Sequence, residues 1–510
     1  KIERAASDSR FPSFQQGFNM RWAAPNLDAV YLCFSAEGTA AALDDALASY
    51  GDGIQIKGGG HCYEDFVYNP DTRAVLDVGP MDGVGVDETR GFYLDAGGTN
   101  WSAFETLFRR YGKVLPAGSC YSVGLGGHIC GGGYGFLSRL HGLTVDWLTG
   151  VDIVVRDDPG APARLVHVGR DSVGDEADLY WAQLGGGGGN FGVITRYYFA
   201  RLPDAPSRAV IATLAFDWQT LTVDKLSALL AAYAEISARN DNRELFGAFK
   251  LMHRSAGEIQ LVLQVAADDL DAAHRAEHET FADLRRALAE VHPHRRVRFP
   301  ITGHPGWSTV PAHACPPVHA YTFYEAVQTL NGSGPNQRGK YKSAYMRKPF
   351  PDDQVAALFE HLQLVPPGLD AQDMQQSLVQ VDTYGGAIND IASTATAVPQ
   401  RSSILKLQYQ TYWQDRSHDA AHLEWIRSLY SAVYARTAGV PDPTLDPTDN
   451  VDGCYFNYPD VDLGRGADRD RALHLYFLDN FRRGERNLVA VKRRWNPSDL
   501  FCSGQSIPVD

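Results

Sequence analysis

Residues 116–135 read PAGSCYSVGLGGHICGGGYG, and the rest of the chain is organised around them. Eight of these twenty residues are glycine, against 49 in the whole chain of 510. Because glycine lacks a Cβ, such density is tolerated where the backbone takes unusual dihedral angles or lies directly against a ligand. A glycine-rich surface loop is the alternative, although such loops usually also contain Ser, Asn and Pro. Four reactive or polar side chains stand between the glycines, namely Cys120, His128, Cys130 and Tyr134.

Two further glycine-rich segments lie in the same part of the chain. GIQIKGGGHCYEDF, residues 53–66, places three glycines between a short predicted strand and His61. Consecutive N–H groups in such a turn form a nest that binds anions, which suits a phosphate, although a lone histidine is more often structural. The cluster at 185–192 formally satisfies GxGxxG. It leads into the β-rich run VITRYYF rather than into a helix, so we reject a Rossmann dinucleotide site there and keep a glycine-rich hairpin as the alternative.

Bulk composition excludes several classes of protein. A net charge of −14 argues against nucleic-acid binding, which needs a basic face. No apolar run approaches the length of a membrane span, and KIERAASDSRF at the start shows no signal pattern, so we expect a soluble protein, cytoplasmic rather than secreted. Seven scattered cysteines do not form a disulfide scaffold. The 11% aromatic content suits a large pocket for a flat or sugar-like ligand.

Periodicity predicts an α+β fold in two domains. Residues 1–202 are expected to form the first domain, with a strand at 29–34, helices at 39–50 and 101–112, and strands across 143–157 and 163–170. Residues 203–445 are expected to form an antiparallel sheet backed by helices, including one over 272–291, with a loop-rich stretch at 307–339. Residues 446–510 are expected to pack back on the first domain.

Two predicted central strands of the second domain bring polar side chains to one face. They are QSLVQVDTYGGAIND and SILKLQYQTYW, and the side chains are Asp382, Tyr384, Gln408 and Gln410. Three glycine-rich segments within the first 195 residues favour one large phosphate-bearing ligand, and the absence of GxxxxGK[ST] argues against a P-loop hydrolase. A zinc site formed from His61, Cys62, Cys120, His128 and Cys130 is the main alternative, but the spacing fits no common zinc pattern.

Five segments together resemble the berberine-bridge-enzyme-like branch of the vanillyl-alcohol-oxidase/p-cresol-methylhydroxylase flavoproteins. KGGGHCYEDF resembles the family's histidine motif, and PAGSCYSVGLGGHICGGGYG resembles its cysteine motif. GGGGGNFGVIT, YFNYPDVDLG and WNPSDLFCSGQSIP are similar to later family motifs in the right order. The chain departs from the plant pattern at Tyr121–Ser122, where Pro–Thr is usual, and at Cys130, where Ser is usual. These changes resemble bacterial members.

The resemblance implies a two-lobed FAD-binding domain, formed by 1–202 and completed by 446–510, beside a substrate domain at 203–445. It also implies FAD attached covalently at two points, with His61 on the 8α-methyl group and Cys120 on C6 of the isoalloxazine. The expected cofactor-binding residues are His61, Cys120, Gly58, Gly59, Gly60, Gly118, Val123, Gly124, Gly127, His128, Asn190, Gly192, Val193 and Asn457. No metal is expected.

The resemblance further implies an oxidase that removes hydride from an alcohol or hemiacetal carbon while a tyrosine takes the hydroxyl proton. Tyr458 is the first choice for this base and Tyr455 its close competitor. Tyr134, Asp382 and Tyr384 are expected to assist. Val123 corresponds to the family's oxygen gate and favours the use of O₂ with release of H₂O₂. The expected partners are a small-molecule substrate and O₂, with no membrane. The substrate is expected to be a secondary metabolite or its sugar, with a carbohydrate or an oxidative ring closure as alternatives. The sequence carries no argument for the oligomeric state.

Overall fold

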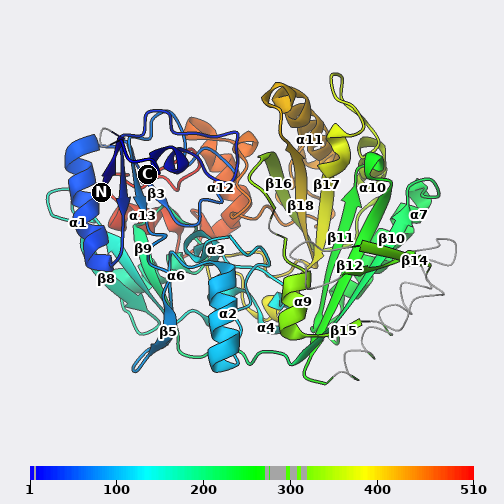
Figure 1. The fold of residues 1–510 in the computed structure, drawn as a ribbon, viewed down its shortest axis with the longest axis horizontal. Coiled ribbons are helices and arrows are strands. Elements are labelled where there is room, and N and C mark those ends of the chain that lie inside the picture. Colours follow the sequence, from blue (N-terminus) through cyan, green and yellow to red (C-terminus); the bar gives the residue numbers. More distant parts are fainter. Residues whose placement is uncertain are drawn as a thin grey trace.

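The computed structural model describes residues 1–4, 7–269, 271, 275, 279, 294–298, 307–311, 319–332 and 334–510. Two lobes lie side by side (Figure 1). Both chain ends lie in one lobe, which carries two small sheets, and a large sheet forms the other lobe. The α+β class and the antiparallel sheet backed by helices are confirmed. The helix expected over 272–291 lies outside the described residues, apart from Arg275 and Glu279.

The first small sheet has the strand order β1-β2-β4-β3. Its strands are β1 (Ile2–Glu3), β2 (Ala29–Leu32), β3 (Ile54–Lys57) and β4 (Ala74–Asp77), and the last three run parallel. Helix α1 (Ala36–Tyr50) connects β2 to β3; the Ser35 hydroxyl caps it by accepting the Gly38 N–H. The glycines that precede His61 follow directly after β3, at the carboxyl edge of the parallel strands, where such sheets commonly bind ligands.

The second small sheet is antiparallel and has the order β5-β6-β9-β7-β8. Its strands are β5 (Val84–Asp87), β6 (Gly91–Asp95), β7 (Gly150–Val155), β8 (Arg164–Gly169) and β9 (Val193–Phe199). The third glycine cluster therefore does lead into a strand. Helix α2 (Asn100–Tyr111) starts with a Thr99 capping box and ends at Gly112, whose φ of 63° is left-handed. Helix α6 (Asp175–Gln183) precedes the cluster.

In this lobe one helix was not predicted, and one local prediction is wrong. Residues 125–130, in the middle of the glycine-rich stretch, form the short helix α3 (Leu125–Cys130), since Leu125, Ile129 and Cys130 bury one side of a turn that glycine alone would not favour. Residues 144–147, expected as strand because of their β-branched and aromatic side chains, form helix α5 (Thr144–Trp147) after α4 (Ser138–His141). The Asp146 carboxylate accepts the Leu143 N–H at 2.7 Å and closes that turn.

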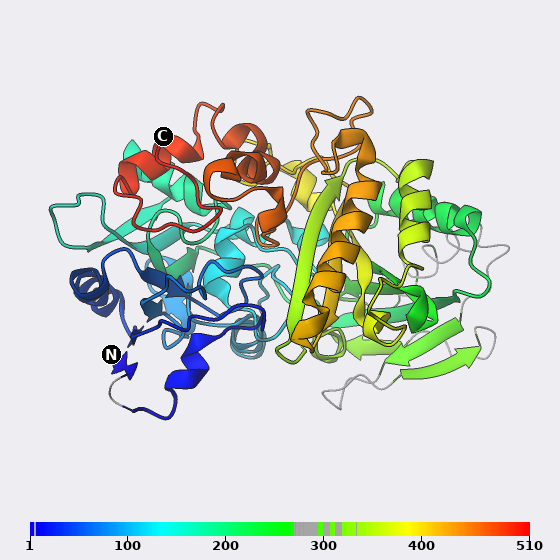
Figure 2. The same cartoon turned by 90° about the horizontal axis from the view of Figure 1, so that it is seen from above.

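The large sheet contains nine strands among the described residues, all paired antiparallel, in the order β14-β13-β10-β12-β11-β17-β18-β16 with β15 beside β10. Helices α7 (Val223–Ala238), α10 (Asp352–His361) and α11 (Asp419–Val433) pack on one face (Figure 2). The strands are β10 (Arg208–Asp217), β11 (Leu245–Met252), β12 (Glu258–Ala267), β13 (His294–Arg298), β14 (Trp307–Pro311), β15 (His319–Thr322), β16 (Arg338–Met346), β17 (Leu378–Thr383) and β18 (Leu405–Trp413).

The stretch 307–339 is less loop-like than predicted. It contains helix α9 (Phe323–Thr329), capped by Thr322 and Glu325, which bond reciprocally to each other's backbone. Phe323 and Ala326 bury one side of this helix. Part of the stretch that was expected to be loop-rich is therefore a helix with one buried side.

The C-terminal segment lies against the lobe that contains the N-terminus (Figure 2). It contains α12 (Arg469–Phe477) and α13 (Leu488–Trp495). The Asn190 side-chain oxygen accepts the Ile507 N–H at 2.9 Å, and the Asn496 amide donates to the Asn190 carbonyl at 2.9 Å. These bonds hold the tail beside the third glycine cluster. The domain boundaries at 202/203 and 445/446 remain predictions.

Candidate active site

A cavity of about 710 Å³ lies where the glycine-rich segments meet the large sheet and the C-terminal tail. Seventeen of the nineteen residues expected in the site line it. They are His61, Cys120, Gly58, Gly59, Gly60, Gly118, Val123, Gly124, Gly127, His128, Asn190, Gly192, Asn457, Tyr134, Tyr455, Tyr458 and Asp382. The other two, Val193 and Tyr384, lie next to lining residues but not in the lining itself. The Tyr384 hydroxyl donates to the Gln400 carbonyl at 3.2 Å.

The histidine loop and the cysteine loop touch at a pair of glycines. A Cβ on Gly59 would lie 2.4 Å from the Gly124 nitrogen, and a Cβ on Gly124 would lie 2.4 Å from the Gly59 nitrogen. Real Cβ atoms do not approach backbone so closely, so neither position accepts a side chain without movement of one loop. This contact holds His61 and Cys120 beside the same cavity.

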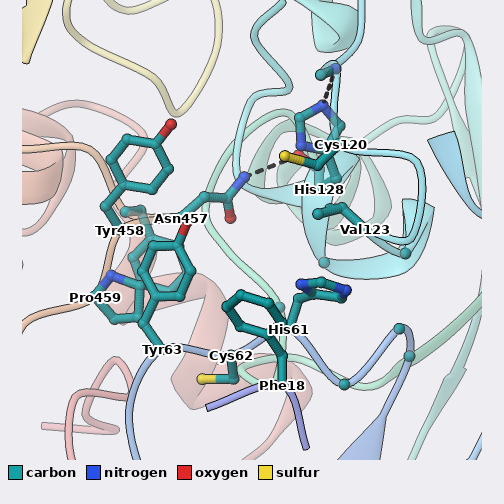
Figure 3. Close-up of a pocket in the computed structure, with 18 of the residues that line it drawn as sticks. Phe18, His61, Cys62, Tyr63, Cys120, Val123, His128, Asn457, Tyr458 and Pro459 are labelled. Atoms are coloured by element: carbon teal, nitrogen blue, oxygen red, sulfur yellow. Dashed lines mark hydrogen bonds between the residues drawn. The ribbon is translucent and has the colours of Figure 1, made fainter. Parts of the chain in front are cut away.

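His61 lies against Phe18, with ring centroids 4.6 Å apart and an interplanar angle of 23° (Figure 3). Burial lowers the pKa of His61 to about 4. The imidazole is therefore neutral at pH 7, and a ring nitrogen lone pair is available for bond formation.

Cys120 lies on the short loop before α3. The Asn100 amide donates to the Cys120 carbonyl at 3.2 Å, and the Val123 N–H donates to the same carbonyl at 3.3 Å. Burial raises the pKa of the Cys120 thiol, and the positive charge of Lys250 opposes that rise. Figure 3 shows the thiol and the imidazole entering the pocket from separate loops, and Val123 is drawn with them.

Asn457 joins the cysteine motif to the tyrosine segment. Its amide donates to the His128 carbonyl at 2.9 Å and to the Tyr455 hydroxyl at 3.0 Å. The His128 ring accepts the Gly118 N–H at 2.9 Å (Figure 3). A Cβ on Gly131 would lie 1.9 Å from the Asn457 side-chain oxygen, so only glycine leaves room for this junction.

The donor set and the space around it fit a dinucleotide. A Cβ on Gly127 or Gly189 would meet no atom within 4 Å, although both glycines line the cavity. These positions form a cradle in which backbone N–H groups can approach a phosphate closely. Among the described residues, no group of three or more His, Cys, Asp or Glu side chains is placed to hold a metal ion.

The tyrosines differ in what their hydroxyl groups contact. The Tyr134 hydroxyl donates to the Thr383 carbonyl, and the Tyr455 hydroxyl accepts from Asn457. The Tyr458 hydroxyl accepts a hydrogen bond from the ammonium of Lys406 at 3.0 Å. Burial raises the pKa of Tyr458 well above its usual value, and Tyr63 and Asp382 act in the same direction. A cation at hydrogen-bonding distance favours the phenolate and opposes these effects.

Lys406 lies beside the cavity, in contact with Tyr458, and the sequence analysis did not select it. It is fully buried on β18, 3.7 Å from Asp382 on β17, and its nitrogen lies 4.1 Å from the Tyr458 ring centroid. Burial lowers its pKa to about 8, while Asp382 acts to raise it. The alternation of SILKLQYQ places Lys406 on the same face as Gln408 and Gln410, and a lysine on that face is the signal that was available.

The cavity wall on the large sheet combines apolar side chains, such as Phe246 and Met252, with a group of polar ones. Lys250, Gln380, Asp382, Gln408, Gln410 and Tyr412 line it, and all come from neighbouring strands. Tyr63, two residues after His61, stacks on Tyr341 with centroids 3.6 Å apart and accepts a bond from Gln408 at 3.0 Å. Asp382 is the one carboxylate among the described lining residues.

Comparison with known proteins shows the family of this chain. Residues 28–158 match the family model described as an FAD binding domain, and residues 454–508 match the model described as berberine and berberine like. The protein is thus an FAD-linked oxidoreductase that acts on CH–OH groups. It belongs to the berberine bridge enzyme-like family of the vanillyl-alcohol-oxidase/p-cresol-methylhydroxylase flavoproteins, so that the resemblance in the sequence is confirmed.

Several relatives align over nearly the whole chain. A hexose oxidase of Chondrus crispus is 44% identical over 98% of this chain and 94% of its own. An aclacinomycin-N/aclacinomycin-A oxidase of Streptomyces galilaeus is 33% identical over 99% and 89%. Among solved structures, a glycopeptide hexose oxidase in complex with teicoplanin is similar with a TM-score of 0.83 and 30% identity, over 99% of this chain and 98% of the other. In the described part of this chain, no helix is long and apolar enough to cross a membrane.

Proposed function

We propose that this protein is a bicovalent FAD oxidase that converts the hemiacetal carbon of a sugar to a lactone and reduces O₂ to H₂O₂. The observation that carries the proposal is the Lys406–Tyr458 contact at 3.0 Å, at the edge of a cavity whose sheet wall includes amides, a carboxylate and a lysine among its apolar side chains. Sugars present both donors and acceptors, and such a wall can satisfy both. This moves the carbohydrate ahead of the secondary metabolite that the sequence ranked first.

His61 and Cys120 would hold the cofactor. A neutral imidazole and a thiol, each on a glycine-bordered loop, are suitable nucleophiles for bonds to the 8α-methyl group and C6. When bound, FAD supplies the electron chemistry: it takes hydride from the substrate carbon and delivers the electrons to O₂. The two attachments would fix the ring in a cavity that stays wide enough for a sugar.

Tyr458 would act as the general base. Lys406 stabilises the Tyr458 phenolate through its hydrogen bond and its position over the ring; that phenolate then takes the proton of the substrate hydroxyl and becomes the neutral phenol. Asp382 keeps Lys406 charged and in place. Tyr455 is less suited to the role, because its hydroxyl is already held by Asn457 in a fully buried position.

Polar side chains on the sheet would orient the sugar. Gln380 donates to Asp382 at 2.8 Å, and Gln410 donates to the Gln408 side-chain oxygen at 3.0 Å, so this wall is already ordered. An ordered wall costs less conformational entropy when a substrate binds. Val123, beside the cysteine loop, would leave the path for O₂ open because it is smaller than leucine.

There are two alternatives, another class of substrate and another reaction. A glycosylated antibiotic or a polyketide alcohol is favoured by the similarity to the aclacinomycin oxidase and to the oxidase bound to teicoplanin. Oxidative ring closure through a C–H bond would need a free carboxylate base. Asp382 is not free, because it pairs with Lys406 at 3.7 Å; burial raises its pKa and Lys406 opposes that rise.

Peroxide release tests the proposal. Purified protein is assayed with a panel of free hexoses, disaccharides, the corresponding 1-O-methyl glycosides and aromatic polyketide glycosides. We expect turnover with free reducing sugars and none with the methyl glycosides, which lack the anomeric hydroxyl. Turnover confined to polyketide glycosides, or equal turnover of methyl glycosides, would contradict oxidation at a hemiacetal carbon.

A further inference from the structure

Three segments that are distant in sequence meet at a group of buried charges. Glu64 lies three residues after His61, Lys340 and Lys342 lie on β16, and Asp460 lies two residues after Tyr458. The Lys340 ammonium is 2.5 Å from one Glu64 oxygen and 2.6 Å from one Asp460 oxygen, and each of the three side chains is 1% exposed. We call Glu64, Lys340, Lys342, Asp460 and Asp462 the ion network.

The other members of the ion network, together with the neighbouring Arg427, balance the charges. Lys342 is 2.8 Å from the second Asp460 oxygen and 2.8 Å from Asp462. Arg427 donates to both Asp462 oxygens, at 2.7 and 3.0 Å. Three carboxylates therefore face three cations, and each oxygen of Asp460 is held by a different lysine.

Strand β16 contacts the histidine loop through two adjacent residues on opposite faces. Lys340 bonds to Glu64, and Tyr341 stacks on Tyr63 at 3.6 Å. The same strand reaches the tyrosine segment, because the Ser343 hydroxyl accepts the Tyr455 N–H at 3.0 Å. Since β16 also pairs with β18, which carries Lys406, one strand contacts the histidine loop, the tyrosine segment and the strand of the buried lysine.

Such a network is poorly explained as a source of stability alone. Desolvation of buried charges offsets much of their attraction, whereas loss of one partner leaves an uncompensated charge. What the network does provide is a fixed geometry, because several short charged hydrogen bonds must be satisfied together. The two segments that it fixes are those that carry His61 and Tyr458.

We propose that Lys340 and Lys342 are positioning residues that hold the His61 loop and the Tyr458 segment in register with each other. Neither lysine touches the substrate; they act through Glu64 and Asp460. The inference rests on the proposed function, in which His61 carries the cofactor and Tyr458 acts on the substrate. It adds that β16, the strand at one edge of the large sheet, determines how His61 and Tyr458 are placed.

Three variants test this proposal. Lys340→Met removes the shared cation. The double variant Glu64→Gln/Lys340→Met restores the charge balance but not the link between the segments. Arg401→Met is the matched control, because Arg401 and Asp146 form another buried pair at 2.7 Å, with side chains 2% and 7% exposed, and neither lines the cavity. The readouts are Tm, hydrogen exchange of peptides covering 58–66 and 455–463, and the fraction of tryptic His61 peptide that carries flavin.

We expect Lys340→Met to lower Tm, to speed exchange at least tenfold in both peptides and to reduce the flavin-bearing His61 peptide several-fold. The double variant should recover most of the Tm but neither of the other two readouts. Arg401→Met should lower Tm and leave both readouts unchanged. The proposal is overturned if flavin attachment and exchange recover together with Tm, or if Arg401→Met reproduces the losses. Should the wild-type His61 peptide carry no flavin, the proposed attachment fails, and the exchange data alone then decide this inference.

Discussion

The Lys406 ammonium donates to the Tyr458 hydroxyl at 3.0 Å and lies 4.1 Å from the centroid of the same ring. The rings of Tyr134 and Tyr455 lie 4.8 and 5.0 Å from the same nitrogen. This buried cation is enclosed by three aromatic rings and bonds to one hydroxyl, which is the reason that we propose Tyr458 as the base. The catalytic predictions follow from this contact.

Tyr458→Phe removes the proposed base and keeps the ring. We expect kcat to fall by about 10²–10⁴-fold, the usual contribution of a general base, with little change in flavin content. Stopped-flow reduction by substrate measures this step. Tyr455→Phe is the matched control and should lose far less; equal losses in both variants would contradict the assignment of the base.

Lys406→Met removes the positive charge that lies beside the Tyr458 hydroxyl. Because an opposite charge at this distance lowers a pKa, its loss should raise the pKa of Tyr458 and move the acidic limb of the kcat–pH profile upward by about one unit or more. At neutral pH the variant is therefore slower, and part of the activity returns as the pH rises. A profile that keeps its acidic limb would show that Lys406 does not act on the base.

The basic limb of the kcat–pH profile also tests Lys406, through the loss of the positive charge of this residue at high pH. The pKa of Lys406 is lowered to about 8, so its charge is present below that pH and is lost above it. We expect kcat to fall above about pH 8 in the wild type. In Lys406→Arg the guanidinium stays charged, so this limb should move well above pH 8. An unchanged basic limb in Lys406→Arg would assign it to another group.

Two glycines of the cavity should respond differently to alanine. In Gly59→Ala the new Cβ would lie 2.4 Å from the Gly124 nitrogen, so we expect a loss of stability of about 1–3 kcal/mol, as for other overpacked sites. In Gly127→Ala the Cβ enters open space that lines the cavity, so the fold should keep its Tm while FAD binding weakens. Thermal unfolding and flavin absorbance separate the two effects, and a common loss of Tm would refute the distinction.

Val123→Leu should narrow the proposed path for O₂ beside the cysteine loop. We expect substrate to reduce the enzyme at the wild-type rate, whereas reoxidation by O₂ becomes slower and an artificial electron acceptor still supports turnover. Oxygen electrode and dye-coupled assays measure the two rates. If Val123→Leu is reoxidised by O₂ at the wild-type rate, Val123 does not control the access of O₂.

The periodicity of apolar residues was enough to predict the α+β class. The glycine-rich segments were enough to predict a large ligand, because glycine beside His61 and Cys120 suits a backbone that lies directly against one. The local structure within them was not predictable in the same way. Residues 125–130 form a helix because Leu125 and Ile129 find a buried surface that only the folded protein provides. Thr144–Trp147 has strand-like composition, yet the Asp146 side chain closes a helical turn there.

The candidate site was predictable where residues are adjacent in sequence and less so where they meet across strands. Asp382 and Gln408 were expected on one sheet face, but Lys406 on the same face was not selected, since its pairing with Tyr458 spans 52 residues. The ion network had no local signal either. Glu64 and Lys340 are 276 residues apart, and their contact depends on the meeting of the two lobes.

Mass spectrometry of the denatured, trypsin-digested protein tests the central claim most directly. The account predicts one species in which the peptide containing His61 and the peptide containing Cys120 are joined through a single FAD, and it predicts that His61→Ala and Cys120→Ala each leave the flavin on the remaining peptide. Recovery of both peptides unmodified, with all the flavin released in acid, would contradict it.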